Sequence, residues 1–190
     1  MRFFSCDQLY QGDVYRLSSL RGDLRFFHRA TPREPHSAPR VREVLSLCDD
    51  PYLLDPDELE TLADHTPGHQ EIAATILRRM LTVTSLGFAL ARLYASRRTP
   101  LFPNSQSAIR WFHANTPSAD RNRLCLPRSL FAAKTSAEFA TSGAVVIGTM
   151  LPTRNLHAWV IEQRRQPDDA DRVWVCYRPI GILLQGDLGI

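Results

Sequence analysis

The chain has 190 residues, 44% of them hydrophobic and 23% charged, with a formal net charge of +3. This length is enough for one core, or for a small and a medium domain, since domains usually run to about 100–150 residues. The composition is that of a globular protein and excludes a wholly disordered chain.

Three other protein classes also fit the sequence poorly. The first residues, MRFFSCDQLYQGD, lack the apolar stretch and cleavage site of a secretory signal, so we expect a cytoplasmic protein with reduced thiols. The apolar segment 72–95 contains three arginines, which are costly in a bilayer, so we expect no membrane span. The four cysteines, at 6, 48, 125 and 176, form no CxxC pair, which disfavours a zinc knuckle or a disulfide scaffold.

The N-terminal part predicts a hairpin followed by short helices. Two apolar runs, Val14–Leu20 and Leu24–His28, flank an Arg-Gly-Asp bend, which favours a β-hairpin. A proline-rich connector follows. Segment 41–48 then predicts a short helix, and segment 55–65 a better one, because it opens with an Asp-Pro-Asp-Glu capping signal.

The middle of the chain is predicted to be helical. Segment 70–97 has the longest helical periodicity, with Gly87 as the expected kink, and segment 107–114 predicts another short helix. The composition changes near Thr66-Pro67-Gly68. We therefore divide the chain into an N-terminal region, 1–66, and a second domain, 67–190.

The most informative stretch runs from Cys125 to Glu162. It predicts a helix that begins with the cysteine, a buried strand at 144–149 and a second strand at 156–162. Pro127 is tolerated only in the first turn of a helix, which places Cys125 at or next to the N-cap. The free N–H groups and the helix dipole at that position favour a thiolate.

A histidine on the second strand suits the role of general base. His157 shares a strand face with Trp159, and an imidazole shielded from water can take the thiol proton. An acid that orients the imidazole would complete a triad, and Asp168 and Asp169 lie just beyond this strand. A third strand within 172–184, with Cys176 in the core, should complete a small antiparallel sheet on the cysteine helix. The predicted fold class is α+β.

Other polar residues near the cysteine have open roles. Arg123 and Arg128 flank Cys125, and each could hold substrate or be a solvated residue of the helix end. His113 is expected to be packed or at the surface. His65 and His69 have a ligand spacing, but Pro67 and Gly68 interrupt the helix between them, which disfavours metal binding.

The runs CLPRSLFAA, VVIGT and HAWVIE together resemble the leader peptidases of lasso-peptide biosynthesis. Those proteins have a transglutaminase-like, papain-related cysteine peptidase core. Cys125, Gly148 and His157 are spaced as in that family, and the similarity covers the C-terminal third of the chain.

The resemblance implies a cysteine endopeptidase that removes the leader from a ribosomally made precursor peptide. Cys125 and His157 would act with an aspartate, which the family's spacing puts at Asp169, while Asp168 and Asp171 remain alternatives in the same QPDDAD run. An asparagine-synthetase-like cyclase is the implied partner. ATP dependence would act through that cyclase, since no Walker-type loop or other cofactor motif is visible here.

Alternatives remain for region 1–66 and for the function. Some proteins of this family carry a small winged-helix-like module that binds the leader by strand addition. Region 1–66 is either such a module or a divergent structural extension. The same triad could instead transfer acyl groups to amines, as in transglutaminases. The basic segment 97–134 would also suit a non-catalytic peptide- or nucleic-acid-binding module, although we expect no nucleic-acid partner.

Overall fold

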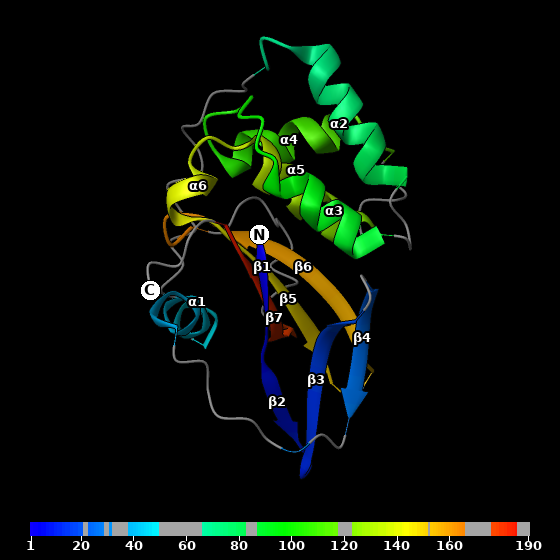
Figure 1. Ribbon diagram of the computed structural model, residues 1–190, viewed down its shortest axis with the longest axis vertical. Helices are drawn as coiled ribbons and strands as arrows, with labels where there is room; N and C mark the ends of the chain where they lie inside the picture. Colours follow the sequence, from blue (N-terminus) through cyan, green and yellow to red (C-terminus); the bar gives the residue numbers. More distant parts are fainter. Residues whose placement is uncertain are drawn as a thin grey trace.

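The computed structural model describes residues 1–20, 23–28, 31, 38–49, 66–82, 87–117, 123–151, 153–165 and 176–185. These residues form seven β-strands in two antiparallel sheets and six α-helices, which confirms the predicted α+β class (Figure 1). The predicted helix at 55–65 and the three candidate aspartates at 168, 169 and 171 lie outside the described residues.

A four-stranded antiparallel sheet forms the centre of the molecule. Its strands, in spatial order, are β1 (Arg2–Ser5), β7 (Arg178–Leu184), β5 (Ala144–Met150) and β6 (Asn155–Ile161). The predicted three-stranded sheet is therefore confirmed, and β1 adds a fourth strand that the sequence did not indicate. Both faces of β5 and β7 are buried, which explains their near-continuous apolar sequence.

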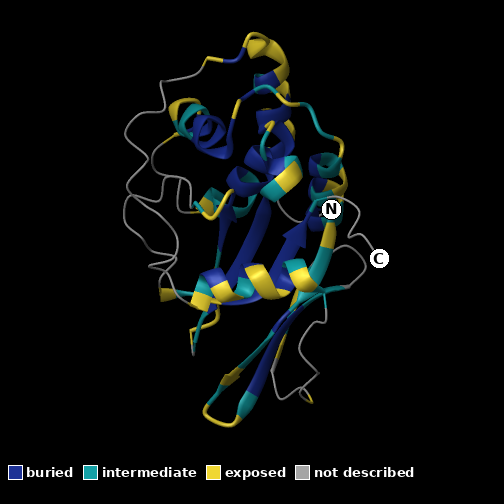
Figure 2. Ribbon diagram, turned by 90° about the vertical axis from the view of Figure 1, so that its left-hand side faces the viewer, coloured by how far each residue is buried: buried dark blue, intermediate teal, exposed yellow. Residues whose placement is uncertain are grey.

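Helices cover both faces of this sheet (Figure 2). One face packs on a layer that contains α2 (Gln70–Thr82), α3 (Gly87–Ser96), α4 (Ser105–Ala114), α5 (Cys125–Thr135) and α6 (Phe139–Ser142). The other face packs on α1 (Pro39–Asp49), whose buried residues Val41, Val44 and Leu47 share one side of the helix. Within the described part of the chain, no helix has the length and apolar character needed to cross a bilayer.

Helix α5 lies in the middle of the helical layer. The Phe131 ring stacks on Trp111 of α4, with centroids 5.7 Å apart, and the Phe131 side chain is fully buried. Near the C-terminus of α5, the Lys134 ammonium donates to two main-chain oxygens. One belongs to Tyr94 in α3 and the other to Arg97, the residue after α3. These contacts hold α5 from its middle to its C-terminus.

The predicted helix at 70–97 is described as α2 and α3, and residues 83–86 between them lie outside the described residues, so the expected kink at Gly87 stays a prediction. One detail of the predicted elements is wrong. Cys176 is exposed and precedes β7, which begins at Arg178, so it does not belong to the core.

The second sheet consists of β2 (Asp7–Tyr10), β3 (Asp13–Leu20) and β4 (Asp23–His28), and it contains the predicted hairpin. Gln11 and Gly12 join β2 to β3, and both have positive φ, as a type I′ turn requires. The sheet is fixed to the central sheet by Gln8, whose side-chain amide donates to the Pro179 oxygen at 2.6 Å.

A buried carboxylate connects the end of β6 to the helical layer. Glu162 is 6% exposed and accepts hydrogen bonds from the Ser105 N–H, the Ser105 hydroxyl and the Ser136 hydroxyl, each at 2.7 Å. Ser105 is the first residue of α4, so a negative charge here also interacts favourably with the helix dipole. Burial nevertheless raises the pKa of Glu162, although these hydrogen bonds oppose the shift.

The raised pKa predicts how stability depends on pH. Because the folded state binds the Glu162 proton more tightly than the unfolded state, the stability that this group contributes is present at acid pH. It is lost as the pH rises through the folded pKa. The Tm of Glu162→Gln minus the Tm of the wild type should therefore be higher at pH 7.5 than at pH 4. Thermal unfolding at both pH values tests this, with the exposed Glu71→Gln as control; an equal difference at both pH values would contradict it.

Candidate active site

Cys125 is the first residue of α5, directly after the N-cap residue Leu124. The N-cap side chain makes no capping hydrogen bond, and Pro127 has no N–H to offer, so the first turn leaves main-chain donors at Cys125 and Leu126 without a side-chain cap. The predicted position of the cysteine at a helix N-terminus is therefore confirmed.

The thiol of Cys125 lies beside β6, the outermost strand of the sheet among the described residues. The His157 side chain and the Ala158 main chain are close enough to the thiol to lower its pKa. Because β6 is the last strand of the described sheet, the main-chain groups of Ala158 can point to α5 instead of to another strand. Residues 32 positions apart in the sequence, on a helix and a strand, are thus brought into contact.

The surroundings of Cys125 favour the thiolate. Burial raises the pKa of the thiol, but the hydrogen bond and positive charge of His157, the Ala158 hydrogen bond and the charge of Arg128 outweigh it. The pKa of Cys125 therefore lies below its ordinary value of 9.0. The thiols of Cys6 and Cys48 show the opposite effect, since burial raises the pKa of each to about 12.

Two aromatic rings hold the His157 imidazole. It stacks on Trp159, two residues along the same strand, with centroids 6.2 Å apart, and it lies 5.2 Å from the ring of Tyr177. Gly148 pairs with His157 across β5 and β6. An added Cβ at Gly148 would lie 2.7 Å from the Trp159 ring and 2.8 Å from the Tyr177 Cβ, so only glycine allows both aromatic residues to approach.

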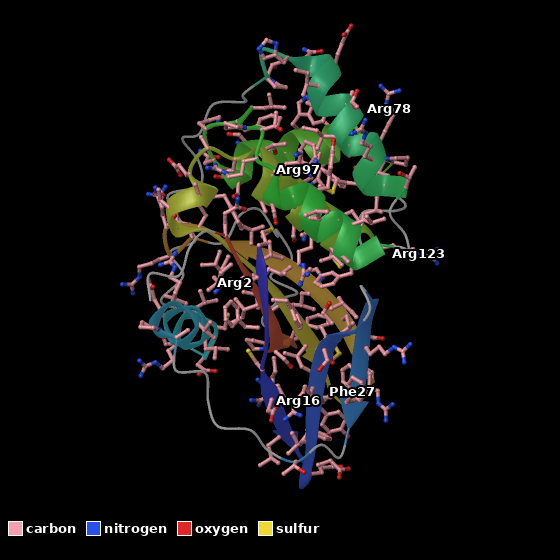
Figure 3. All side chains as sticks on the ribbon, viewed as in Figure 1. Arg2, Arg16, Phe27, Arg78, Arg97 and Arg123 are labelled. Carbon is pink, nitrogen blue, oxygen red and sulfur yellow. The ribbon has the colours of Figure 1, made fainter. Side chains whose placement is uncertain are left out.

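The two arginines near the cysteine have different surroundings. Arg123 is exposed and points away from the molecule (Figure 3), which agrees with a solvated residue of the helix end. Arg128 is buried, and its guanidinium faces the Ala158 oxygen and His113 of α4. In the sequence, the closeness of Arg128 to Cys125 could be recognised from their spacing of three residues, which puts two side chains on the same side of a helix.

Of the other sequence-predicted residues, His69 is exposed. His65 and the three aspartates that compete for the third position of the triad lie outside the described residues. No group of three or more His, Cys, Asp or Glu side chains within the described ranges could hold a metal ion. Tyr177 was not singled out from the sequence, because its contact with His157 depends on how β7 pairs with β5.

Comparisons with protein-family models, with curated proteins and with solved structures found no match to this chain. The chemistry of the site therefore has to be inferred from its residues and their geometry.

Gly148→Ala should disturb the packing that holds His157. The added methyl group overlaps Trp159 and Tyr177, and overpacking of this kind typically costs about 1–3 kcal/mol of the free energy of unfolding. Urea unfolding measures the loss. Gly68→Ala is the matched control, because a Cβ there meets no atom within 4 Å. Equal stability of the two variants would contradict the proposed packing.

Iodoacetamide should distinguish the four cysteines at pH 7. We expect alkylation of Cys125, whose pKa is lowered, and of the exposed Cys176, while Cys6 and Cys48 stay unmodified because only roughly 10⁻⁵ of a thiol with a pKa of about 12 is ionised at this pH. In His157→Ala, alkylation of Cys125 should slow by about tenfold for each unit that its pKa rises. Peptide mass spectrometry reads each site. An unchanged Cys125 rate, with Cys176 as internal reference, would show that His157 does not activate the thiol.

Proposed function

We propose that the protein is a cysteine endopeptidase that removes the leader from a ribosomally made lasso-peptide precursor, with a transglutaminase-like catalytic core. The observation that carries the proposal is that Cys125, at the start of α5, lies beside His157 on β6, and that this neighbour lowers the pKa of the thiol. The resemblance of the runs around these two residues to lasso-peptide leader peptidases supplies the substrate class.

The reaction begins with a proton transfer within the Cys125–His157 pair. The imidazole takes the thiol proton, and the resulting thiolate attacks the scissile carbonyl to form a tetrahedral intermediate. Its collapse breaks the C–N bond, and the imidazolium gives its proton to the leaving amine. Water, deprotonated by His157, then attacks the thioester and releases the carboxylate product with the free thiol.

The oxyanion of the intermediate needs donors that are already in place. The main-chain N–H groups of Cys125 and Leu126, in the first turn of α5, are uncapped by the Leu124 side chain and lie where the helix dipole is positive. Asp169 or Asp168 would orient the imidazole after β6, with Asp171 as a further candidate, while Trp159 and Tyr177 already restrict its ring.

The proposed substrate and partners follow from the same resemblance. The β3–β4 hairpin, with β2 beside it, is the part of region 1–66 that would present a strand edge to the leader. The asparagine-synthetase-like cyclase would take the freed core peptide. ATP would act through that cyclase.

Cys125→Ala should abolish cleavage of a lasso-peptide precursor, because it removes the proposed nucleophile. Mass spectrometry of the precursor after incubation, with and without cyclase and ATP, measures the free leader and core. Cys176→Ala, which removes a different and exposed thiol, should cleave at the wild-type rate.

The products also separate this function from its alternatives. A hydrolase yields free leader and core, whereas an acyl transferase yields a leader joined to an added amine. Processing that survives in Cys125→Ala would overturn the peptidase proposal. Binding of the precursor without cleavage by the wild type would instead indicate a non-catalytic peptide-binding module.

A further inference from the structure

Arg128 lies one helical turn after Cys125 and is almost wholly buried, with 8% of its surface exposed. Its Nη2 donates to the Ala158 oxygen at 3.4 Å, and its Nη1 faces Nε2 of His113 at 3.5 Å. Since a guanidinium can only donate, Nε2 of His113 must accept in that contact. The Arg128 Nε is buried and has no hydrogen-bond partner in the described part of the chain.

These contacts are poor for a buried charge. Good N–H···O bonds are about 2.7–3.2 Å long, and burial of a cation is costly unless such bonds replace water. Arg16 shows the well-satisfied case in the same molecule. It is also 8% exposed, but its Nε and Nη2 donate to the Asp7 carboxylate at 2.6 Å each, and Nη2 reaches the Thr31 oxygen at 2.8 Å. The hydrogen bonds of Arg128 therefore do not explain why a cation is buried there.

The location of Arg128 next to the Cys125 thiol explains why a cation is buried there. The groups that face Cys125 are His157 and the Ala158 main chain from β6 and Arg128 from its own helix, while His113 of α4 lies behind the guanidinium. The Ala158 main chain lies between the two groups, because it lowers the pKa of the thiol and its oxygen accepts from Arg128. A fixed positive charge this close favours the thiolate over the thiol.

We propose that Arg128 is a positioning residue that keeps a permanent positive charge beside Cys125, where it favours the thiolate. The use of that thiolate to attack a peptide bond rests on the proposed function. The thiolate itself can be measured without any substrate peptide.

The test is the pH dependence of Cys125 alkylation by iodoacetamide in the full-length chain, resolved from Cys176 by peptide mass spectrometry. Arg128→Gln should move the midpoint for Cys125 upward by about one pH unit, so that the rate below the midpoint falls about tenfold. Arg128→Lys keeps the charge and should move the midpoint by less than half as much. Arg16→Gln, the equally buried control, should leave it unchanged.

Thermal unfolding separates this role from a merely structural one. Because Arg128 makes only long contacts, Arg128→Gln should unfold close to the wild-type Tm, whereas Arg16→Gln should unfold at a clearly lower temperature. An unchanged Cys125 midpoint in Arg128→Gln, or equal shifts in the Gln and Lys variants, would overturn the proposal. If Arg128→Gln fails to fold, Arg128→Lys is the deciding variant. An alkylation midpoint of Cys125 within half a pH unit of the wild type supports the role of the positive charge, and a shift of a full unit contradicts it. If the Arg128 variants show the expected alkylation shifts but the wild type does not cleave the precursor, the proposed function is refuted and the role of Arg128 stands.

Discussion

The contact between the N-terminus of α5 and the free edge of β6 is the interaction on which the candidate site depends. An edge strand leaves main-chain groups without a strand partner, and such groups are normally a liability. Here the Ala158 main chain lies beside the Cys125 thiol and lowers its pKa, and the Ala158 oxygen accepts from Arg128. The helix thus satisfies the strand edge, and the strand edge in turn places His157 against the thiol.

This arrangement requires that contacts in the middle and at the C-terminus of α5 hold the helix in place. Lys134 is bonded to the main chain at and beyond the end of α3, and Phe131 packs among the aromatic rings of α4. The first turn can therefore keep its N–H groups uncapped and a buried cation nearby, features that cost stability in an ordinary helix. Natural proteins accept such local costs at functional sites, where the gain is chemical.

The N-terminal strands contribute to the site from a distance. Strand β1 pairs with β7, so residues from opposite ends of the sequence share one sheet. Tyr177, just before β7, contacts the His157 ring, and Gln8 of β2 bonds the Pro179 oxygen next to it. The register of β7 therefore sets one side of the surroundings of the imidazole, and Gly148, at the bulge in the β5–β7 pairing, has no side chain to obstruct the Trp159 and Tyr177 rings.

The sequence by itself determined the features that depend on local chemistry. Pro127 set the start of α5, the alternation in β6 put His157 and Trp159 on one face, and the apolar runs predicted the β3–β4 hairpin. Only the tertiary structure decided which distant groups meet. The burial of Arg128, the exposure of Cys176 and the place of β1 depend on contacts between residues far apart in the chain, and local periodicity carries no information about such contacts.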